Sequence, residues 1–294
     1  MGATATGKTG LSLDLAEALG GEVVNTDAMQ VYRGMDIGAA KLPLAERRGI
    51  AHHLLDLLDV HEQASVAEFQ GLARGVIADL RSRGRVPVLV GGSALYTRAI
   101  LDRFDFPVTD PRVRARLADE LERDGVAPLA ARLRDADPAA ASRIERDDGR
   151  RIVRALEVIE LTGRPFSATL PVHEYADPRS IQIGVDIDRA TLEARISARV
   201  REMFDAGLVE EVEALVARGL LESPTAAAAI GYREAAQLLD GVLTREEAVA
   251  RTVVRTRQFA RRQDQWFRKD PRVVWVAYDD PGRVGKAVAA IAMV

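Results

Sequence analysis

The chain has 294 residues, of which 47% are hydrophobic and 29% charged, with a formal net charge of −3 and no cysteine. This length fits one large α/β domain or two smaller ones. The lack of cysteine excludes disulfides and thiolate metal sites and suits a reducing compartment. We find no signal peptide and no apolar run of about eighteen residues, so we expect a soluble, cytoplasmic protein without membrane contact. Because the net charge is negative, any contact with nucleic acid has to come from a local basic patch.

The first residues form the most informative motif. Residues 2–9 read G-A-T-A-T-G-K-T and match the phosphate-binding pattern G-x-x-x-x-G-K-S/T. Glycines let the backbone wrap around an anion, so that successive N–H groups point at phosphate oxygens. Lys8 supplies a charge for the terminal phosphate, and the Thr9 hydroxyl is suited to ligate Mg²⁺. The alternative is a glycine-rich turn that happens to end in Lys-Thr.

One feature of this loop departs from the usual pattern. A phosphate-binding loop normally leaves the end of a buried parallel strand, but only Met1 precedes Gly2. Either the natural start lies upstream of Met1, or the chain lacks a central strand of its sheet, and we favour the upstream start. If so, about eight to ten additional apolar residues before Met1, the length of a long strand, should raise the melting temperature.

The following segments alternate between strand and helix patterns. A helix is predicted at about 8–19, a strand at Val23-Val24 and another strand over 52–58. Ser65 and Glu68 form a capping box for a helix that ends near Arg83. The apolar run 86–90 predicts a buried strand, which Gly91-Gly92-Ser93 and a further helix follow. This order indicates an α/β fold with a P-loop NTPase-like parallel sheet flanked by helices.

The amino-acid composition changes in the middle of the chain. Residues 110–180 are rich in arginine, aspartate and alanine and predict a mainly helical insertion domain, which leaves 1–109 and 181–294 as the P-loop catalytic core. Strand character returns at 181–187, and Asp188 caps a helix to about Phe204. Thr244 and Glu247 form a second capping box. The remaining predicted elements are a helix ending near Arg218, a long helix over 244–269, a strand at 273–276 and a helix at 283–293.

A carboxylate near the phosphate loop is the next candidate. In nucleotide hydrolases an apolar strand ends in the aspartate that holds Mg²⁺, but the strand at 86–90 ends in Gly-Gly-Ser, which disfavours an ATPase or GTPase. Asp27 lies just past the second strand, at the sheet edge where ligands gather, and is suited to bind Mg²⁺ or to act as a general base. The alternative is a helix N-cap in the N-T-D-A stretch.

Arginines carry two more open interpretations. Arg195 and Arg199 lie four residues apart on one predicted helix and could clamp a pyrophosphate, or they could form a solvated face. The helix at 244–269 combines arginines with Phe259, Trp266 and Phe267, which suits either phosphate contact with base stacking or an ordinary amphipathic helix. His52 and His53 are adjacent in a strand and point to opposite faces, so ordinary packing is favoured over a metal site.

Together these motifs resemble the bacterial tRNA dimethylallyltransferases, also called tRNA isopentenyl transferases, almost from end to end. The phosphate loop resembles G-P-T-A-S/T-G-K-T/S. Further blocks resemble D-S-x-Q-x-Y-x-G-x-D-I-G-T-A-K (Asp27 to Lys41), H-H-L-L-D (His52 to Asp56), V-G-G-T-x-L-Y (Val90 to Tyr96), R-x-x-R-A-L-E (Arg151 to Glu157), G-Y-R (Gly231 to Arg233) and R-Q-x-x-W-F-R (Arg262 to Arg268). The departures are Ala3 for proline, Ala28 for serine and Ser93 for threonine. Ala28 loses a hydroxyl, which puts one contact to the target nucleotide in question.

The resemblance implies transfer of a dimethylallyl group from dimethylallyl diphosphate to N6 of adenosine-37 in the tRNA anticodon loop, with Mg²⁺ as cofactor. It implies a catalytic set of Asp27, Lys8, Thr9, Ser93 and Arg195, with Asp27 as base and Thr9 as metal ligand. The implied diphosphate-binding set is Gly2, Thr4, Ala5, Thr6, Gly7, Lys8, Thr9, Arg195 and Arg199. The implied tRNA-binding set is Asp27, Ala28, Met29, Gln30, Ser93, Arg114, Arg151, Arg154, Gly231, Tyr232, Arg233, Arg261, Arg262, Gln263, Trp266 and Arg268. The partners are then dimethylallyl diphosphate and the anticodon stem-loop of tRNA, held by the insertion domain and the C-terminal helices, and we expect a monomer.

Two rival functions remain at this point. A P-loop kinase acting on a nucleoside-like acceptor would share the loop and Asp27, but it does not account for the arginine-rich C-terminal helix. A non-catalytic RNA-binding module that senses a diphosphate belongs to a different class. Replacing Asp27 with alanine separates an enzyme from a non-catalytic module, because only an enzyme loses turnover while it keeps its affinity for tRNA.

Overall fold

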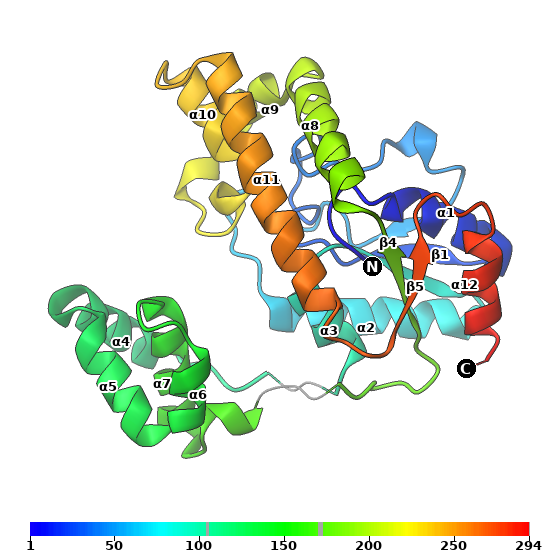
Figure 1. Ribbon diagram of the computed structural model, residues 1–294. Helices are drawn as coiled ribbons and strands as arrows, with labels where there is room; N and C mark the ends of the chain where they lie inside the picture. Colours follow the sequence, from blue (N-terminus) through cyan, green and yellow to red (C-terminus); the bar gives the residue numbers. More distant parts are fainter. Residues whose placement is uncertain (104–105, 170–172, 294) are drawn as a thin grey trace. The chain divides into compact units, whose positions relative to one another are not determined.

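The computed structural model describes residues 1–103, 106–169 and 173–293 (Figure 1). Its internal contacts divide the chain into a larger unit, Met1–Leu101 with Asp177–Val294, and a smaller unit, Asp102–Ala176. The smaller unit therefore begins and ends a few residues earlier than the insertion expected at 110–180.

The strands of the larger unit are all parallel, as the alternating pattern predicts, and the α/β class is confirmed. However, they form two sheets instead of one: β1 (Glu22–Asn25), β2 (His52–His53) and β3 (Pro87–Val90) in the order β2-β1-β3, and β4 (Gln182–Asp186) with β5 (Val273–Ala277). Met1 lies beside β4, where its amino group donates to the Ile183 carbonyl at 2.6 Å and its carbonyl accepts from the Val185 N–H at 3.0 Å. Within the described residues β4 does not pair with β3, and the two sheets are separate.

The helices of the larger unit begin where the sequence places their caps. Ser65 accepts from the Glu68 N–H at 3.3 Å, and Asp188 accepts from the Thr191 N–H at 2.9 Å. Thr244 and Glu247 form the predicted reciprocal capping box. The helices are α1 (Lys8–Leu19), α2 (Val66–Ser82), α3 (Ala94–Leu101), α8 (Arg189–Asp205), α9 (Leu208–Val216), α10 (Tyr232–Leu239), α11 (Arg245–Phe267) and α12 (Arg283–Ile291), with short 3₁₀ helices η1 (Leu44–Glu46), η3 (Leu220–Glu222) and η4 (Ala226–Ala228).

One local prediction was wrong, and one helix was missed. The strand expected over 52–58 stops at His53, because Leu54 and Asp56 take left-handed φ values of 64° and 56°, which break an extended ladder. Helix α10 was not predicted. It follows Gly231, whose N–H donates to the Glu234 carboxylate at 2.9 Å, so the glycine and the acid three residues later were the available signal.

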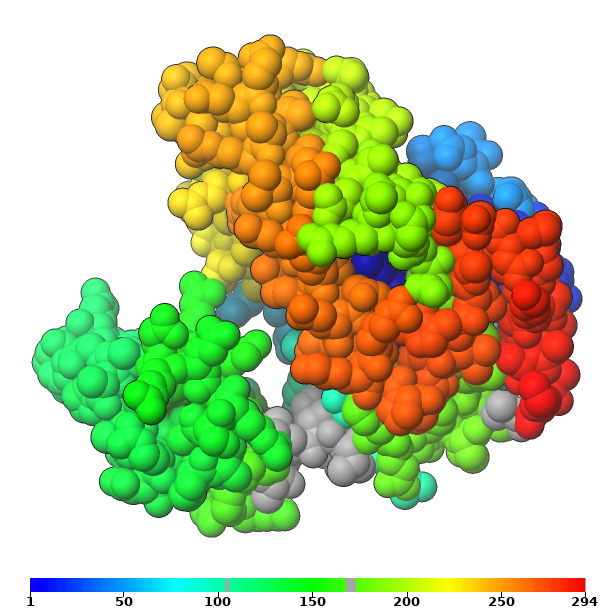
Figure 2. Space-filling model, viewed as in Figure 1, coloured from blue at the N-terminus to red at the C-terminus, as the bar shows by residue number. Residues whose placement is uncertain are grey.

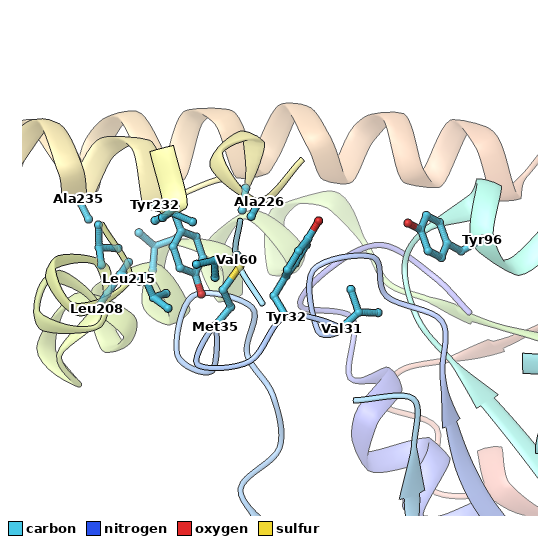
Figure 3. Close-up of a cluster of buried hydrophobic side chains, with 14 of the residues drawn as sticks. Val31, Tyr32, Met35, Val60, Tyr96, Leu208, Leu215, Ala226, Tyr232 and Ala235 are labelled. Atoms are coloured by element: carbon cyan, nitrogen blue, oxygen red, sulfur yellow. The ribbon is translucent and has the colours of Figure 1, made fainter. Parts of the chain in front are cut away.

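Two hydrophobic cores position the site within the larger unit. One lies on the side of the first sheet that α2 covers and continues under α8, α9 and α10. Figure 3 shows part of it, with Tyr32 and Met35 from the segment after β1 beside Leu208 and Tyr232 from α9 and α10. The other core joins α1 and α12 to the β4–β5 sheet. Val24 belongs to the first core while Val88 packs against the second, so the first sheet is covered on both faces.

The smaller unit consists of helices packed around their own core of leucine, isoleucine, valine and alanine. Aspartates cap three of these helices, and Gly149 leaves room for Leu121, which a Cβ there would approach to 2.7 Å. Within the described part of this unit no multi-residue strand forms; Asp102 and Tyr175 make an isolated bridge. The elements are α4 (Pro111–Asp124), α5 (Val126–Ala136), α6 (Pro138–Arg143), α7 (Gly149–Thr162) and η2 (Phe166–Thr169). None of the helices in the described ranges combines the length and apolar character that crossing a bilayer requires.

Candidate active site

The phosphate loop turns into α1 through two left-handed residues. Ala5 has φ 63° and Gly7, the N-cap of α1, has φ 96°. No side chain caps the first turn of α1, so its N–H groups and the positive end of the helix dipole remain available to an anion. Thr6 donates its hydroxyl proton to the Ala3 carbonyl at 2.9 Å and thereby stabilises the turn of the loop.

Lys8 lies at the centre of this loop. Its Nζ donates to the Ala3 carbonyl at 2.5 Å. Burial lowers the pKa of Lys8 to about 8; the nearby Asp27 carboxylate opposes this shift and the Arg199 guanidinium adds to it. The ammonium therefore stays mostly charged at neutral pH, but in surroundings that favour an added negative charge.

Two cavities meet at the phosphate loop. The larger cavity, of about 520 Å³, is bounded by the loop, the segment after β1, the Gly91–Ser93 turn, α8, α10 and α11. The smaller cavity, of about 430 Å³, lies between the loop and α8. Ala5, Lys8, Thr9 and Arg199 line both of them. In Figure 2, atoms from the start of the chain are visible between the atoms of α8 and α11.

Helix α8 supplies the other cationic groups. Arg195 and Arg199 both line the smaller cavity, together with Gly7 and Glu202. The Arg195 guanidinium also lies 5.6 Å from the centre of the Tyr278 ring. Burial lowers the pKa of Arg199, and Asp27 and Glu202 oppose that shift. The two arginines and Lys8 thus surround a space suited to an anion with two phosphates.

Asp27 lines the larger cavity and follows β1, as the sequence predicts. No helix begins there in the described structure, so the N-cap alternative is wrong. Instead, Asp27 Oδ1 accepts from the Met29 N–H at 2.9 Å, and the Asn25 side chain bonds both the N–H and the carbonyl of Asp27. Among the described residues nothing donates to Oδ2, which remains available as a base.

The turn after β3 completes the wall on the opposite side. Ser93 lines the larger cavity. Gly91 packs on Thr26, because a Cβ at Gly91 would lie 2.2 Å from its hydroxyl oxygen. Gly92 approaches the Gln263 amide from α11 equally closely, at 2.4 Å from a would-be Cβ. Close packing therefore explains why glycines replace the aspartate of a nucleotide hydrolase at this point.

Other predicted residues fall into two groups. Thr4, Ala28, Met29, Gln30 and Tyr232 also line the larger cavity. Gly2, Thr6, Gly231 and Arg233 line neither cavity. Tyr232 is buried and donates its hydroxyl proton to Glu211 at 2.6 Å; burial raises its pKa far above the usual range.

The predicted residues of α11 divide in the same way. Arg262 and Gln263 line the larger cavity, whereas Arg261, Trp266 and Arg268 do not. Arg261 bonds Glu193 at 3.2 Å, and Arg268 bonds Asp186 and Asp264 while lying 4.3 Å from the Trp275 ring centre. Trp266 stacks with Arg98 at 5.3 Å.

The predicted arginines of the smaller unit are held by acids. Arg114 and Arg154 both donate to Glu157 at 2.7 Å, and Arg151 pairs with Asp148 at 3.3 Å. Glu157 is fully buried. Burial raises its pKa, but the hydrogen bonds from Thr109, Arg114 and Arg154 outweigh that effect and lower the pKa to about 2.

Sequence reasoning missed much of the cavity wall. Ile196, Val200 and Met203 form an apolar face of α8 toward the larger cavity, and their i, i+4, i+7 spacing was the available signal. Helix α11 adds three residues that were not predicted, Thr252, Thr256 and Gln258. Arg255 and Phe259, which belong to the arginine and aromatic stripe named as an open candidate, also line this cavity.

The described residues contain no cluster of three or more histidines, aspartates or glutamates arranged to hold a metal ion. His52 bonds the Ile50 carbonyl at 2.9 Å, and His53 bonds Glu22 at 2.7 Å, so both are engaged in local packing.

A phosphate-binding loop at a helix N-terminus, a cluster of cations around it and a cavity with an available carboxylate define an α/β protein that acts on a phosphorylated ligand. Comparison with known proteins identifies the family. The model of the family described as IPP transferase matches residues 30–270, so the chain belongs to the IPP transferase family.

The relatives and solved structures agree with this assignment. A tRNA dimethylallyltransferase from Nocardioides sp. is 68% identical over 292 residues, which cover 99% of this chain and 94% of the relative. The crystal structure of a tRNA isopentenylpyrophosphate transferase from Bacillus halodurans is similar with a TM-score of 0.72 and 39% identity, covering 99% of this chain and 94% of that one. A eukaryotic dimethylallyltransferase, described as acting on tRNA, is similar with a TM-score of 0.83 at 27% identity, covering 99% and 76%. Membership in this family decides against the kinase and the non-catalytic module.

Proposed function

We propose that this chain transfers a dimethylallyl group from dimethylallyl diphosphate to N6 of adenosine-37 in the tRNA anticodon loop. The products are N6-isopentenyladenosine in tRNA and pyrophosphate. The observation that carries the proposal is the wall shared by the two cavities, where Lys8, Thr9 and Arg199 separate an anion site from a space that contains Asp27.

The smaller cavity is suited to the diphosphate of the donor. The loop N–H groups, Lys8, Arg195 and Arg199 would bind its oxygens and neutralise the charge that develops as pyrophosphate leaves. The apolar face of Ile196, Val200 and Met203 on the larger-cavity side would accept the dimethylallyl tail. The reacting allylic carbon would then lie near the shared wall.

The residues present also fit Mg²⁺ as cofactor. Thr9 offers a hydroxyl oxygen at the helix N-terminus and lines both cavities. Mg²⁺ keeps several waters and takes only one or two protein ligands when a substrate supplies phosphate oxygens, which agrees with the absence of a protein cage among the described residues. Bound there, the ion would add positive charge to the leaving diphosphate.

Asp27 is the proposed base. The C–O bond to pyrophosphate breaks, the adenine N6 forms a bond to the allylic carbon, and a proton of N6 passes to Asp27. Its Oδ2 is available, whereas Oδ1 is oriented by the Met29 N–H. Ser93 lines the same cavity and would hold the amine in place.

Recognition of tRNA would involve the outer wall of the larger cavity and the smaller unit. Arg262 is exposed, lines that cavity and has no carboxylate partner in the described structure, so it is well placed for a phosphate. The target base would leave its stack and enter beside Ala28, Met29, Gln30 and Tyr232. We also propose that the smaller unit contacts the stem-loop through Arg114, Arg151 and Arg154, and that Gly231, Arg233, Arg261, Trp266 and Arg268 add contacts.

The proposed substrates place the reaction in the cytoplasm, and we propose that the chain acts as a monomer, because all the proposed catalytic groups come from one chain. A single-turnover reaction with unmodified tRNA, Mg²⁺ and labelled dimethylallyl diphosphate tests the function. We expect label on N6 of one anticodon-loop adenosine.

The Asp27→Asn variant is the matched control for this reaction. It should lose transfer while its affinity for tRNA stays within about threefold of wild type, since asparagine keeps the shape but not the base. Label on another atom, or full activity of Asp27→Asn, would contradict the proposed chemistry.

A further inference from the structure

Gln263 joins two loops that lie far apart in the sequence. Its Oε1 accepts from the Thr4 N–H in the phosphate loop at 2.8 Å, and its Nε2 donates to the Gly92 carbonyl at 2.7 Å. The residue is 6% exposed and lies near the C-terminal end of α11. Because one partner is an N–H and the other a carbonyl, the orientation of the amide is fixed.

The bond to Thr4 acts on the geometry of the phosphate loop. Thr4 directly precedes Ala5, whose left-handed φ of 63° turns the backbone toward the anion site. By accepting the Thr4 N–H, Gln263 fixes the peptide plane that enters this turn. The N–H groups that follow are then held in the arrangement that binds phosphate oxygens.

The bond to Gly92 acts on the opposite wall. Gly92 directly precedes Ser93, which lines the larger cavity. A Cβ at Gly92 would lie 2.4 Å from Gln263 Nε2 and 3.6 Å from the Gly2 carbonyl oxygen. The absence of a side chain at Gly92 is therefore what lets the amide reach both loops.

We propose that Gln263 is a positioning residue that holds the phosphate loop and the Gly91–Ser93 turn in register, so that the donor diphosphate and the acceptor amine face each other. The inference rests on the proposed function. It replaces the tRNA contact that the sequence assigns to Gln263, because the structure already engages the amide with two backbone groups in a buried position.

The test compares Gln263→Ala, Gly92→Ala and the double variant. Binding of inorganic pyrophosphate with Mg²⁺ and binding of tRNA are measured separately by calorimetry. Gln263→Ala should bind pyrophosphate about tenfold more weakly, as expected for the loss of a buried hydrogen-bond pair, while its tRNA affinity stays within about twofold. A purely structural loss would weaken both ligands.

Gly92→Ala should reproduce this loss, because its Cβ displaces the Gln263 amide. In the double variant the amide is absent and the methyl group introduced by Gly92→Ala has room. The double variant should therefore bind pyrophosphate no more weakly than either single variant. Gln265→Ala is the matched control, since Gln265 is exposed on the same helix and has no hydrogen bond in the described structure. Gln263→Met, which keeps most of the buried volume, serves if the alanine variant does not fold.

Two results would overturn the inference. One is weakened tRNA binding with unchanged pyrophosphate binding, which would make Gln263 an RNA contact. The other is a double variant in which the losses of pyrophosphate affinity caused by Gln263→Ala and Gly92→Ala simply add. A wild-type protein that binds pyrophosphate in a Gln263-dependent way but transfers nothing to tRNA would instead contradict the proposed function alone.

Discussion

Helices α8 and α11 run side by side in the larger unit (Figure 1). Both carry several arginines, but the two sets differ in whether their charges are paired with acids. On α8, Arg195 and Arg199 face the smaller cavity, and neither forms an ion pair in the described structure. On α11, most arginines are neutralised by carboxylates of α8, α10 or other segments. These paired residues are Arg245, Arg255, Arg257 and Arg261, and Arg268 directly after the helix is paired as well. An arginine without an acid is available to a ligand at once, whereas a paired arginine has to give up its ion pair before it binds one.

The strongest test of this contrast is Arg199→Ala. Removing a partly buried guanidinium from the anion site should lower kcat/KM for dimethylallyl diphosphate about 100-fold, since one group that stabilises a developing charge typically contributes this much. The control is Arg189→Ala on the same helix, because Arg189 already pairs with Glu193 at 2.9 Å. Similar losses in both variants would show that pairing does not distinguish the two kinds of arginine.

The smaller unit offers a test of the paired class. Glu157→Gln should lower the free energy of unfolding by about 2 kcal/mol, because Arg114 and Arg154 lose their buried acceptor while Arg114 remains half exposed to screening solvent. Circular dichroism melts at pH 7 measure this change. The matched control is Glu160→Gln, whose acid pairs with Arg116 at the surface.

The same carboxylate predicts a pH dependence with a defined sign. The hydrogen bonds lower the pKa of Glu157 to about 2 from an ordinary value of 4.5. Its contribution to stability is therefore complete above pH 4.5 and is lost as the pH falls through about 2. If the free energies of unfolding of the wild-type protein and the Glu157→Gln variant differ by the same amount at pH 7 and at low pH, this assignment is contradicted.

The sequence predicted the local elements well because their signals are local. Ser65, Asp188 and Thr244 cap their helices as their side-chain chemistry dictates, and the apolar runs at β3, β4 and β5 formed strands. The prediction of a strand over 52–58 was wrong because two residues other than glycine take left-handed φ values. Tertiary contacts impose such values, and propensity does not reveal them. The split into two sheets depends on long-range pairing in the same way.

The site was predictable only where a motif fixes geometry. The phosphate loop and Asp27 line a common cavity, as the loop motif and the end of a parallel strand predict. In contrast, nothing in the residues around Gln263 shows that its amide binds Thr4 and Gly92, which are 259 and 171 positions away. Nor does a count of arginines reveal which of them will meet Glu157 or Glu193. Pairing is decided by the tertiary structure.

Lys8 provides a pH test of the unpaired class. Burial lowers its pKa to about 8, and only the protonated ammonium attracts the diphosphate, so donor binding should be complete below that pH and weaken above it. We expect kcat/KM for dimethylallyl diphosphate to fall about tenfold per pH unit above this pKa. The Lys8→Arg variant keeps its charge and should lack the break, although it starts from lower activity. A flat wild-type profile up to pH 9.5 would exclude a role for this proton.

The smallest expected effect separates two arginines at the end of α11. Arg262 lines the larger cavity without a carboxylate partner, whereas Arg268 bonds Asp186 and Asp264 and stacks on Trp275. Arg262→Ala should weaken tRNA binding about fivefold and reduce the slope of log K against log salt by about 1, as expected for one lost phosphate contact. Arg268→Ala should change the slope little, because its charge is already balanced by two acids. If instead Arg268→Ala produces the larger change in slope, its ion pairs must open when tRNA binds, and the distinction between paired and unpaired arginines holds only for the protein without RNA.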